Sequence, residues 1–163
     1  MSPSGASEWT DLFVAAAGAS AALTGLVFVA VSINIQEILR LPGVPDRALA
    51  TLMLLLGAVV ISLLPLIPDQ SATALGIELV AVGIAFIAVI GITGARSIRR
   101  ADNAAVRVEL VVLAGLGTVP YVIGGLLVLA DVDGGLYWVI GGVIGAICGA
   151  VLNAWVLLVE ILR

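Results

Sequence analysis

The sequence predicts an all-α fold, a bundle of five transmembrane helices that forms a single domain over residues 1–163. Composition is the first reason, because 62% of the residues are hydrophobic and 11% are charged, whereas soluble domains are roughly half apolar and a quarter charged. The second reason is that the apolar residues fall into five almost uninterrupted stretches. At about 1.5 Å per residue, each is long enough to cross a hydrocarbon core of roughly 30 Å as a helix.

The first predicted helix covers residues 12–35 and contains no charged side chain. A helical repeat places Ser20, Thr24 and Asn34 on one stripe, and Gly18 and Gly25 on the opposite stripe. Hydroxyl and amide groups are typical of a polar pathway or of hydrogen bonds between helices, and small residues let another backbone come close. We therefore expect this helix in the middle of the bundle or at a contact between subunits.

The second and third predicted helices cover residues 48–67 and 72–95. The preceding segment, residues 36–47, contains two prolines and a glycine, which are expected to stop a helix. Pro65 is expected to kink or end the second helix, because proline cannot donate a backbone hydrogen bond. The turn at residues 68–71 is too short to do more than reverse the chain.

The fourth and fifth predicted helices cover residues 108–130 and 136–159, joined by a tight turn rich in aspartate and glycine. The segment before the fourth helix, residues 96–107, is the most charged part of the chain. We expect it to be a loop, with Asp102 or Asn103 as the N-cap of the helix that follows.

The arginines predict the orientation of the bundle. All seven basic residues are arginines, and they lie in the two long connections or at the C-terminus: Arg40, Arg47, Arg96, Arg99, Arg100, Arg107 and Arg163. Because basic residues gather on the cytoplasmic side, the N-terminus is expected outside and the C-terminus in the cytoplasm. We expect a multi-pass protein of the cell membrane, in contact with the lipid bilayer, and frequent Ala, Gly, Val and Arg favour a bacterial source.

Four of these arginines, Arg96, Arg99, Arg100 and Arg107, form a predicted cytoplasmic basic cluster. A role in setting the orientation is sufficient to explain it. The alternative is a site for anionic lipid headgroups or for an acidic face of a partner.

Glu78 is the charged residue that lies deepest in a predicted span, about 9 Å from the outer end of its helix. A carboxylate at that depth is costly, so it is expected to face protein or water and not lipid. A part in an ion, proton or solute pathway is one interpretation. The other is a structural carboxyl group that is hydrogen-bonded to a neighbouring helix or reaches the outer interface.

The fifth predicted helix carries a small-residue pattern and one amide. Gly141, Gly145 and Gly149 form two overlapping GxxxG motifs, which are typical of close helix packing within a chain or between chains. The simplest role for Asn153 is a hydrogen bond to another helix, and Asn34 or Ser32 of the first helix is the expected partner.

Pro120 lies in the middle of the fourth predicted helix and interrupts its backbone hydrogen bonds. Channels and transporters use such breaks to coordinate ions or to bend at gates, and many inert helices contain one as well.

Several classes of function are disfavoured. The chain has no histidine or lysine and a single cysteine, Cys148, so it lacks the usual proton shuttle, Schiff-base amine, disulfide and zinc ligands. We therefore expect no enzyme activity, no metal and no cofactor. No basic cluster alternates with aromatic residues, which argues against nucleic-acid binding.

The composition leaves two main hypotheses. The first is a homo-oligomeric channel or facilitator for an ion or small solute, with a path lined by the polar residues of the spans: Ser20, Thr24, Asn34, Glu78 and Asn153. The alternative is a non-catalytic accessory or regulatory subunit of a larger membrane complex, which docks through the small-residue faces. The expected partners are accordingly copies of the chain or other membrane subunits.

Overall fold

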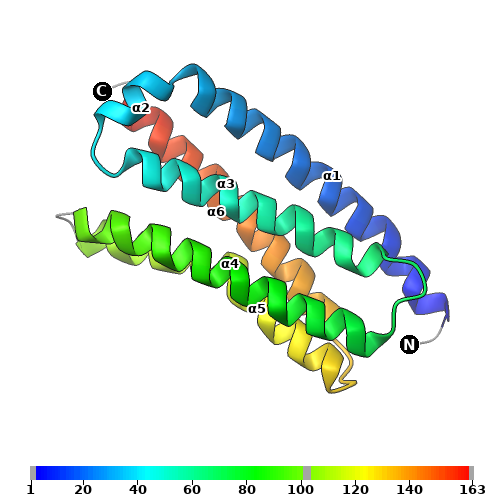
Figure 1. The fold of residues 1–163 in the computed structure, drawn as a ribbon. Helices are drawn as coiled ribbons and strands as arrows, with labels where there is room; N and C mark the ends of the chain where they lie inside the picture. Colours follow the sequence, from blue (N-terminus) through cyan, green and yellow to red (C-terminus); the bar gives the residue numbers. More distant parts are fainter. Residues whose placement is uncertain (1–2, 101–103, 162–163) are drawn as a thin grey trace.

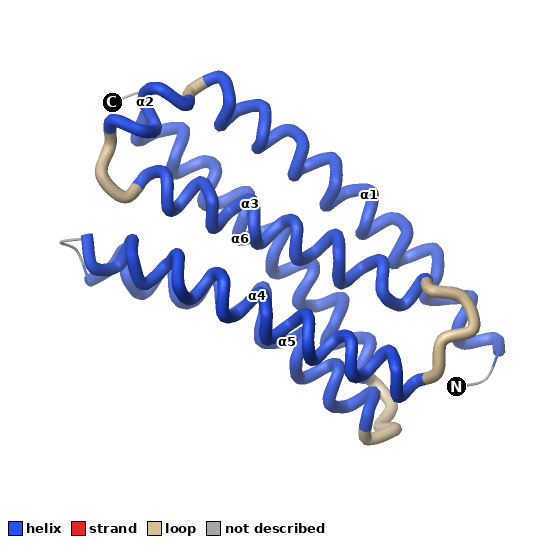
Figure 2. Tube along the Cα trace, in the orientation of Figure 1, coloured by secondary structure: helices blue, strands red, loops and turns tan. Residues whose placement is uncertain are grey.

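A computed structural model describes residues 3–100 and 104–161, and these residues form helices joined by short turns (Figures 1 and 2). The helices in chain order are α1 (Pro3–Ile33), α2 (Ile35–Arg40), α3 (Val44–Leu63), α4 (Ala72–Arg100), α5 (Ala104–Leu129) and α6 (Gly135–Ile161). A single turn of 3-10 helix, η1 (Leu64–Leu66), follows α3.

Helices α3, α4, α5 and α6 form an antiparallel four-helix bundle. Each packs against the next in the chain, and α6 returns to pack against α3, which closes the ring. Helix α1 lies outside this ring, packed along α3 with a smaller contact to α6 (Figure 1). Of the two positions expected for the first helix, the middle of the bundle is therefore wrong, and a contact between subunits stays a prediction. The middle position fails because the apolar faces of the four later helices cover one another.

The lengths and composition of the helices identify a multi-pass membrane protein. Four of them contain a segment long and apolar enough to span a bilayer: Trp9–Ile33, Val44–Leu66, Ala72–Ile92 and Gly135–Trp155. A shorter apolar segment, Gly115–Leu129, belongs to α5. The orientation across the membrane stays a prediction. The two ends of the bundle differ in charge, one being acidic and the other rich in arginine.

The acidic end is formed by the start of α1, the turn between α3 and α4, and the turn between α5 and α6. The opposite, arginine end is formed by α2, the start of α3 and the last turns of α4 and α6 (Figure 1).

The two long connections contain more helix than the sequence predicts. Gly43 adopts φ 83°, and Pro45 then lies in the first turn of α3, so this proline starts a helix where we expected it to stop one. A proline is tolerated there because first-turn N–H groups have no partner within the helix. At the other connection α4 continues to Arg100 and α5 begins at Ala104. The expected caps, Asp102 and Asn103, lie outside the described residues.

At the acidic end the turns are defined by local hydrogen bonds. Pro65 lies in η1, where the α-helical pattern of α3 ends. Ser71 caps α4, because its Oγ accepts a hydrogen bond of 3.1 Å from the backbone N–H of Ala74. Asp69 has φ 54° in this turn, a left-handed conformation that aspartate tolerates better than most residues.

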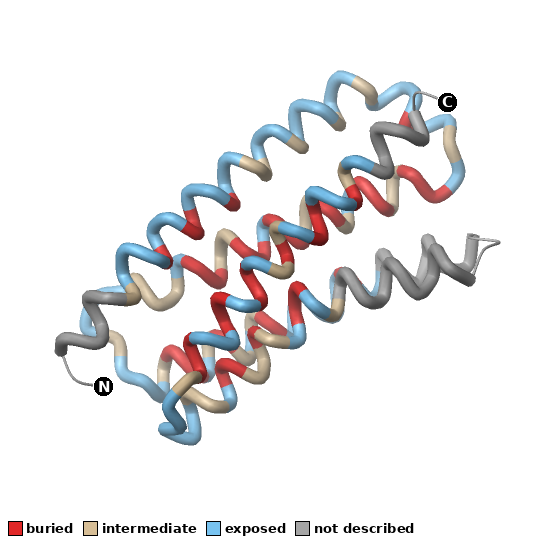
Figure 3. Tube along the Cα trace, turned by 180° about the vertical axis from the view of Figure 1, so that it is seen from behind, coloured by how far each residue is buried: buried red, intermediate tan, exposed pale blue. Residues whose placement is uncertain are grey.

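The bundle interior is filled with apolar side chains. Those that are completely inaccessible include Phe13 of α1, Leu55 and Ile61 of α3, Leu79 of α4 and Val139 of α6. Figure 3 shows buried positions on the facing sides of the bundle helices, whereas most of α1 is exposed on its outward side. The outward apolar side chains are those that a bilayer would surround.

Candidate functional site

A buried polar cluster joins α3 to α6 near the arginine end. Nη2 of Arg47 donates a hydrogen bond of 3.0 Å to Oδ1 of Asn153, and Nδ2 of Asn153 donates to Oγ1 of Thr51. Oγ1 of Thr51 donates in turn to the carbonyl oxygen of Arg47, at 2.9 Å. The exposed fractions are 7% for Arg47, 6% for Asn153 and 1% for Thr51. The cluster is thus a cross-link made of side chains that water scarcely reaches.

The location of Arg47 is unfavourable for a cation by two criteria. It lies in the first turn of α3, where the helix dipole is positive, and it is buried. The oxygen of Asn153 offsets part of that cost, because hydrogen bonds to charged groups are among the stronger ones. The sequence analysis assigned Arg47 only to topology and expected Asn34 or Ser32 to bond Asn153. The structure pairs Asn153 with α3 instead.

The predicted polar stripe of α1 is largely bonded to α1 itself. Oγ1 of Thr24 donates to the carbonyl oxygen of Ser20 at 2.7 Å, and Nδ2 of Asn34 donates to that of Ala30 at 2.9 Å. Ser20 is completely buried, and its Oγ has no hydrogen-bond partner within the part of the chain that the structure describes. These side chains therefore do not form a continuous row of exposed polar atoms.

Glu78 is hydrogen-bonded to Gln70 near the acidic end of the bundle. Its Oε2 accepts a hydrogen bond of 2.6 Å from Nε2 of Gln70, which lies in the turn between α3 and α4. Glu78 is half-buried, whereas Ala81, Ala85 and Ala88, farther along the same stripe, are exposed. The carboxylate thus reaches back toward the end of the bundle, as a side chain seeking the interface would.

The predicted packing glycines differ in what surrounds them. A Cβ atom at Gly18, Gly25 or Gly141 would meet no atom within 4 Å apart from the residue's own neighbours. At Gly145 it would lie 2.7 Å from the carbonyl oxygen of Leu116 in α5, so α5 and α6 approach closely there. Gly149 is buried.

The close approach at Gly145 is connected to Pro120. Proline has no N–H to donate to the carbonyl four residues earlier, so it leaves the carbonyl of Leu116 without its helical partner. Gly145 brings its Cα against that carbonyl, a geometry in which weak Cα–H···O contacts form. An apolar groove of about 370 Å³ lies beside this contact, lined by Leu116, Pro120, Tyr137, Trp138, Gly141 and Gly145.

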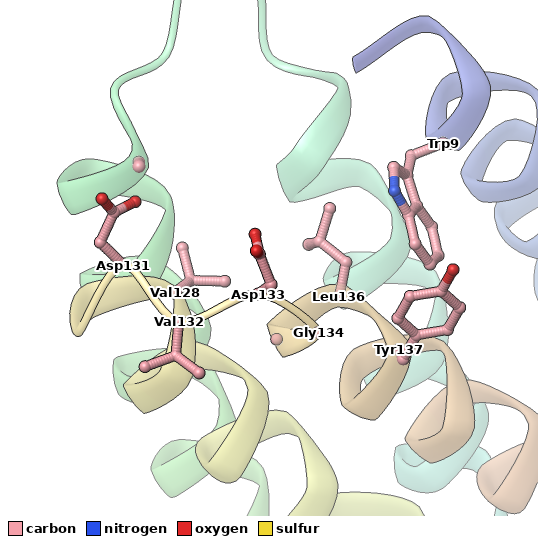
Figure 4. Close-up of a pocket in the computed structure, with 10 residues that line it drawn as sticks. Trp9, Val128, Asp131, Val132, Asp133, Gly134, Leu136 and Tyr137 are labelled. Atoms are coloured by element: carbon pink, nitrogen blue, oxygen red, sulfur yellow. The ribbon is translucent and has the colours of Figure 1, made fainter. Parts of the chain in front are cut away.

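The second cavity opens at the acidic end and has a volume of about 300 Å³. Figure 4 shows it among the start of α1, the start of α4 and the turn between α5 and α6. The rings of Trp9 and Tyr137 are nearly perpendicular, at 82°, with centroids 4.7 Å apart. The lining residues are Trp9, Ala72, Val128, Asp131, Val132, Asp133, Gly134, Gly135, Leu136 and Tyr137.

Comparisons with protein-family models, curated proteins and solved structures found no match to this chain. The chain is a multi-pass membrane protein. Any more specific function has to be argued from its own residues.

The four arginines of the predicted basic cluster lie where α4 ends and α5 begins. Arg96, Arg99 and Arg100 belong to the last turns of α4 and Arg107 to the first turn of α5, and their side chains lie outside the described part of the structure. Their role in orientation stays a prediction.

Two features of the site could not be predicted from the sequence. Thr51 follows Arg47 by four residues, which places both on one face of a helix, but their common neighbour on α6 is 102 and 106 residues away. The second feature is the contact between the rings of Trp9 and Tyr137. Their contact depends on how α1 docks, which no local pattern shows.

Proposed function

We propose that the protein is a non-catalytic accessory subunit of a larger membrane complex. The observation that best supports this is that four of the five predicted pathway residues are already bonded inside the chain, Ser20 being the exception. Thr24 and Asn34 donate to carbonyls of α1, Glu78 accepts from Gln70, and Asn153 is enclosed between α3 and α6. A solute path needs polar groups that contact the solute, whereas a subunit that only packs does not.

The interior of the four-helix bundle supports the same proposal. The side chains of Leu55, Ile61, Leu79 and Val143 are all completely buried there. They occupy the space between the helices that a path through one chain would require. Close-packed apolar interiors leave few voids larger than a water molecule.

The outward side of α1 is the surface through which such a subunit would dock. Gly18, Ala22 and Gly25 are exposed on this side, and α1 lies outside the ring of the other helices. A transmembrane helix of another membrane protein could approach this backbone closely, because small residues permit backbone contact.

Site-specific photocrosslinking tests the proposal. A photoreactive residue in place of Gly25 is expected to give one discrete adduct with a different membrane protein in cells that express the chain at its native level. The matched control is the same residue in place of Ile84, which is 54% exposed on α4 and is expected to react with lipid. If the Gly25 position gives no protein adduct, the accessory proposal is wrong.

A homo-oligomeric channel or facilitator is the second candidate, and one observation favours it. The charged side chains described at the acidic end are all carboxylates, which would attract cations to a path between copies. An adduct of the Gly25 position with a second copy of the chain would favour this candidate over the accessory subunit.

Cation flux into proteoliposomes then distinguishes the channel from the accessory subunit. Flux through the purified chain that falls on Glu78→Gln or Thr24→Val would establish a pathway and contradict the accessory proposal. No flux through the unmodified chain would eliminate the channel.

A further inference from the structure

The cavity at the acidic end combines three features that suit a small organic cation. It has a volume of about 300 Å³, an aromatic pair on one side and two carboxylates on the other. Trp9 and Tyr137 supply the rings, and Asp131 and Asp133 of the α5–α6 turn supply the carboxylates (Figure 4). Leu136 and Val128 add apolar surface to the lining.

The charge around this cavity has a single sign. The chain segments that form the acidic end, residues 3–11, 64–75 and 128–137, contain no lysine, arginine or histidine. Asp131 and Asp133 are both exposed. A concave surface with charges of one sign raises the local concentration of counter-ions.

We propose that this cavity binds the ammonium group of a small organic cation, such as the trimethylammonium head of choline. The carboxylates provide the opposite charge, the faces of the aromatic rings attract cations, and the apolar lining contacts the alkyl substituents. The site goes beyond the proposed function, because it would serve an accessory subunit and a channel equally.

A bare metal ion is a poorer occupant of this cavity. Calcium and magnesium need six or more oxygen ligands, and among the described residues no group of three or more His, Cys, Asp or Glu could hold a metal. An alkylated ammonium ion needs no such ligand shell, because its charge is spread over methyl groups that contact aromatic and apolar surface.

The turn that carries the carboxylates is held in place by its own backbone. Asp131 has φ 53° and Gly134 has φ 98°, and the N–H of Val132 donates a hydrogen bond of 3.0 Å to the carbonyl of Leu127. Asp131 and Asp133 therefore project from a defined turn, which reduces the entropy lost when a ligand binds.

The ammonium group has two sources, since the end of a transmembrane helix lies near lipid headgroups. One is the headgroup of a zwitterionic lipid, and the other is a soluble amine. Both present the same chemistry to the cavity, so the test has to separate them by the composition of the bilayer.

Fluorescence of Trp9 provides the assay. In the full chain carrying Trp138→Phe and Trp155→Phe, Trp9 is the only tryptophan, and the chain is placed in nanodiscs of phosphatidylglycerol, which has no ammonium group. Choline chloride is expected to change the fluorescence saturably. Its neutral isostere 3,3-dimethyl-1-butanol, which has the same shape without the charge, is expected to leave it unchanged.

Substitutions of the residues that line the cavity test whether they bind choline. Asp133→Asn is expected to weaken choline binding about fivefold, as the loss of one charge near the ligand predicts, and Tyr137→Leu about twofold to fivefold. The matched control is Asp69→Asn, which removes the same charge from the same end but not from the cavity lining, and which is expected to change the affinity less than twofold. Asp131→Asn serves as a second variant if Asp133→Asn fails to fold, because asparagine also tolerates a positive φ.

Each outcome has a defined meaning. Weaker choline binding in phosphatidylcholine nanodiscs than in nanodiscs of an uncharged glycolipid, which has neither an ammonium group nor the negative surface that concentrates cations, would identify a lipid headgroup as the natural occupant, and equal binding would identify a soluble amine. The proposal is overturned by the absence of a saturable change with choline, by an equal response to the neutral isostere, or by an equal loss in Asp69→Asn and Asp133→Asn.

Discussion

Substitution of Gly145 by alanine would force α5 and α6 apart. The added methyl carbon would lie 2.7 Å from the carbonyl oxygen of Leu116 and 3.2 Å from its carbonyl carbon, and both atoms belong to backbone that cannot rotate away. Ordinary van der Waals contact begins near 3.4 Å, so the helices would have to separate by about 0.7 Å, the difference from 2.7 Å. Overpacking of this kind lowers the free energy of unfolding by about 1 to 3 kcal/mol.

Gly141→Ala is the matched control, because it adds the same methyl group one turn earlier on the same helix. No atom would lie within 4 Å of that methyl group apart from the residue's own neighbours, and alanine is the better helix former. Reversible unfolding by SDS in mixed micelles, followed by circular dichroism, measures both variants. We expect Gly145→Ala to unfold at lower SDS than the unmodified chain and Gly141→Ala at equal or higher SDS. Equal stability of the two variants would refute the close contact between α5 and α6.

Three further substitutions test other contacts by the same unfolding measurement. Asn153→Leu removes the oxygen that accepts from Arg47 and is expected to lower the free energy of unfolding by about 1.5 to 3 kcal/mol, the range for a hydrogen bond to a charged group; a neutral effect would contradict the cluster. Ser62→Ala is expected to be neutral or stabilising, because the Oγ of this fully buried serine has no hydrogen-bond partner among the described residues; a loss above about 1 kcal/mol would show that the hydroxyl is bonded. Gln70→Ala removes the hydrogen-bond donor to Glu78 and is expected to lower the free energy of unfolding by about 1 kcal/mol. It is also expected to speed the reaction of Glu78 with a carbodiimide, and an unchanged rate would mean that the two side chains do not meet.

The length and apolarity of each stretch are what made the membrane-spanning helices predictable. A bilayer leaves the backbone few alternatives to a helix, so a stretch such as residues 72–95 determines its own secondary structure. The start of α3 shows where the same reasoning fails. Pro45 can end one helix or begin the next, and the positive φ of Gly43 is what places it in a first turn.

The neighbours of the polar residues could not be predicted, because helical periodicity gives the face of a residue and not the helix opposite. Asn153 was expected to bond to the first helix, but its partner depends on which helix closes the ring, and that helix is α3. Glu78 illustrates a second limit. Its depth along the helix suggested an intramembrane site, and the flexible side chain instead reaches Gln70 in the preceding turn. The position of α1, and hence the contact of Trp9 with Tyr137, required the complete fold.

The closure of α6 against α3 has a consequence for how the chain is made. Arg47 and Asn153 are 106 residues apart, so α3 emerges from the ribosome and enters the membrane long before its hydrogen-bonding partner has been synthesised. Arg47 lies in the first turn of α3, within reach of the aqueous boundary, and its guanidinium group can stay hydrated there during that interval. Insertion of α6 then removes this charge from water, so the arrival of α6 is the step that locks α3 in place.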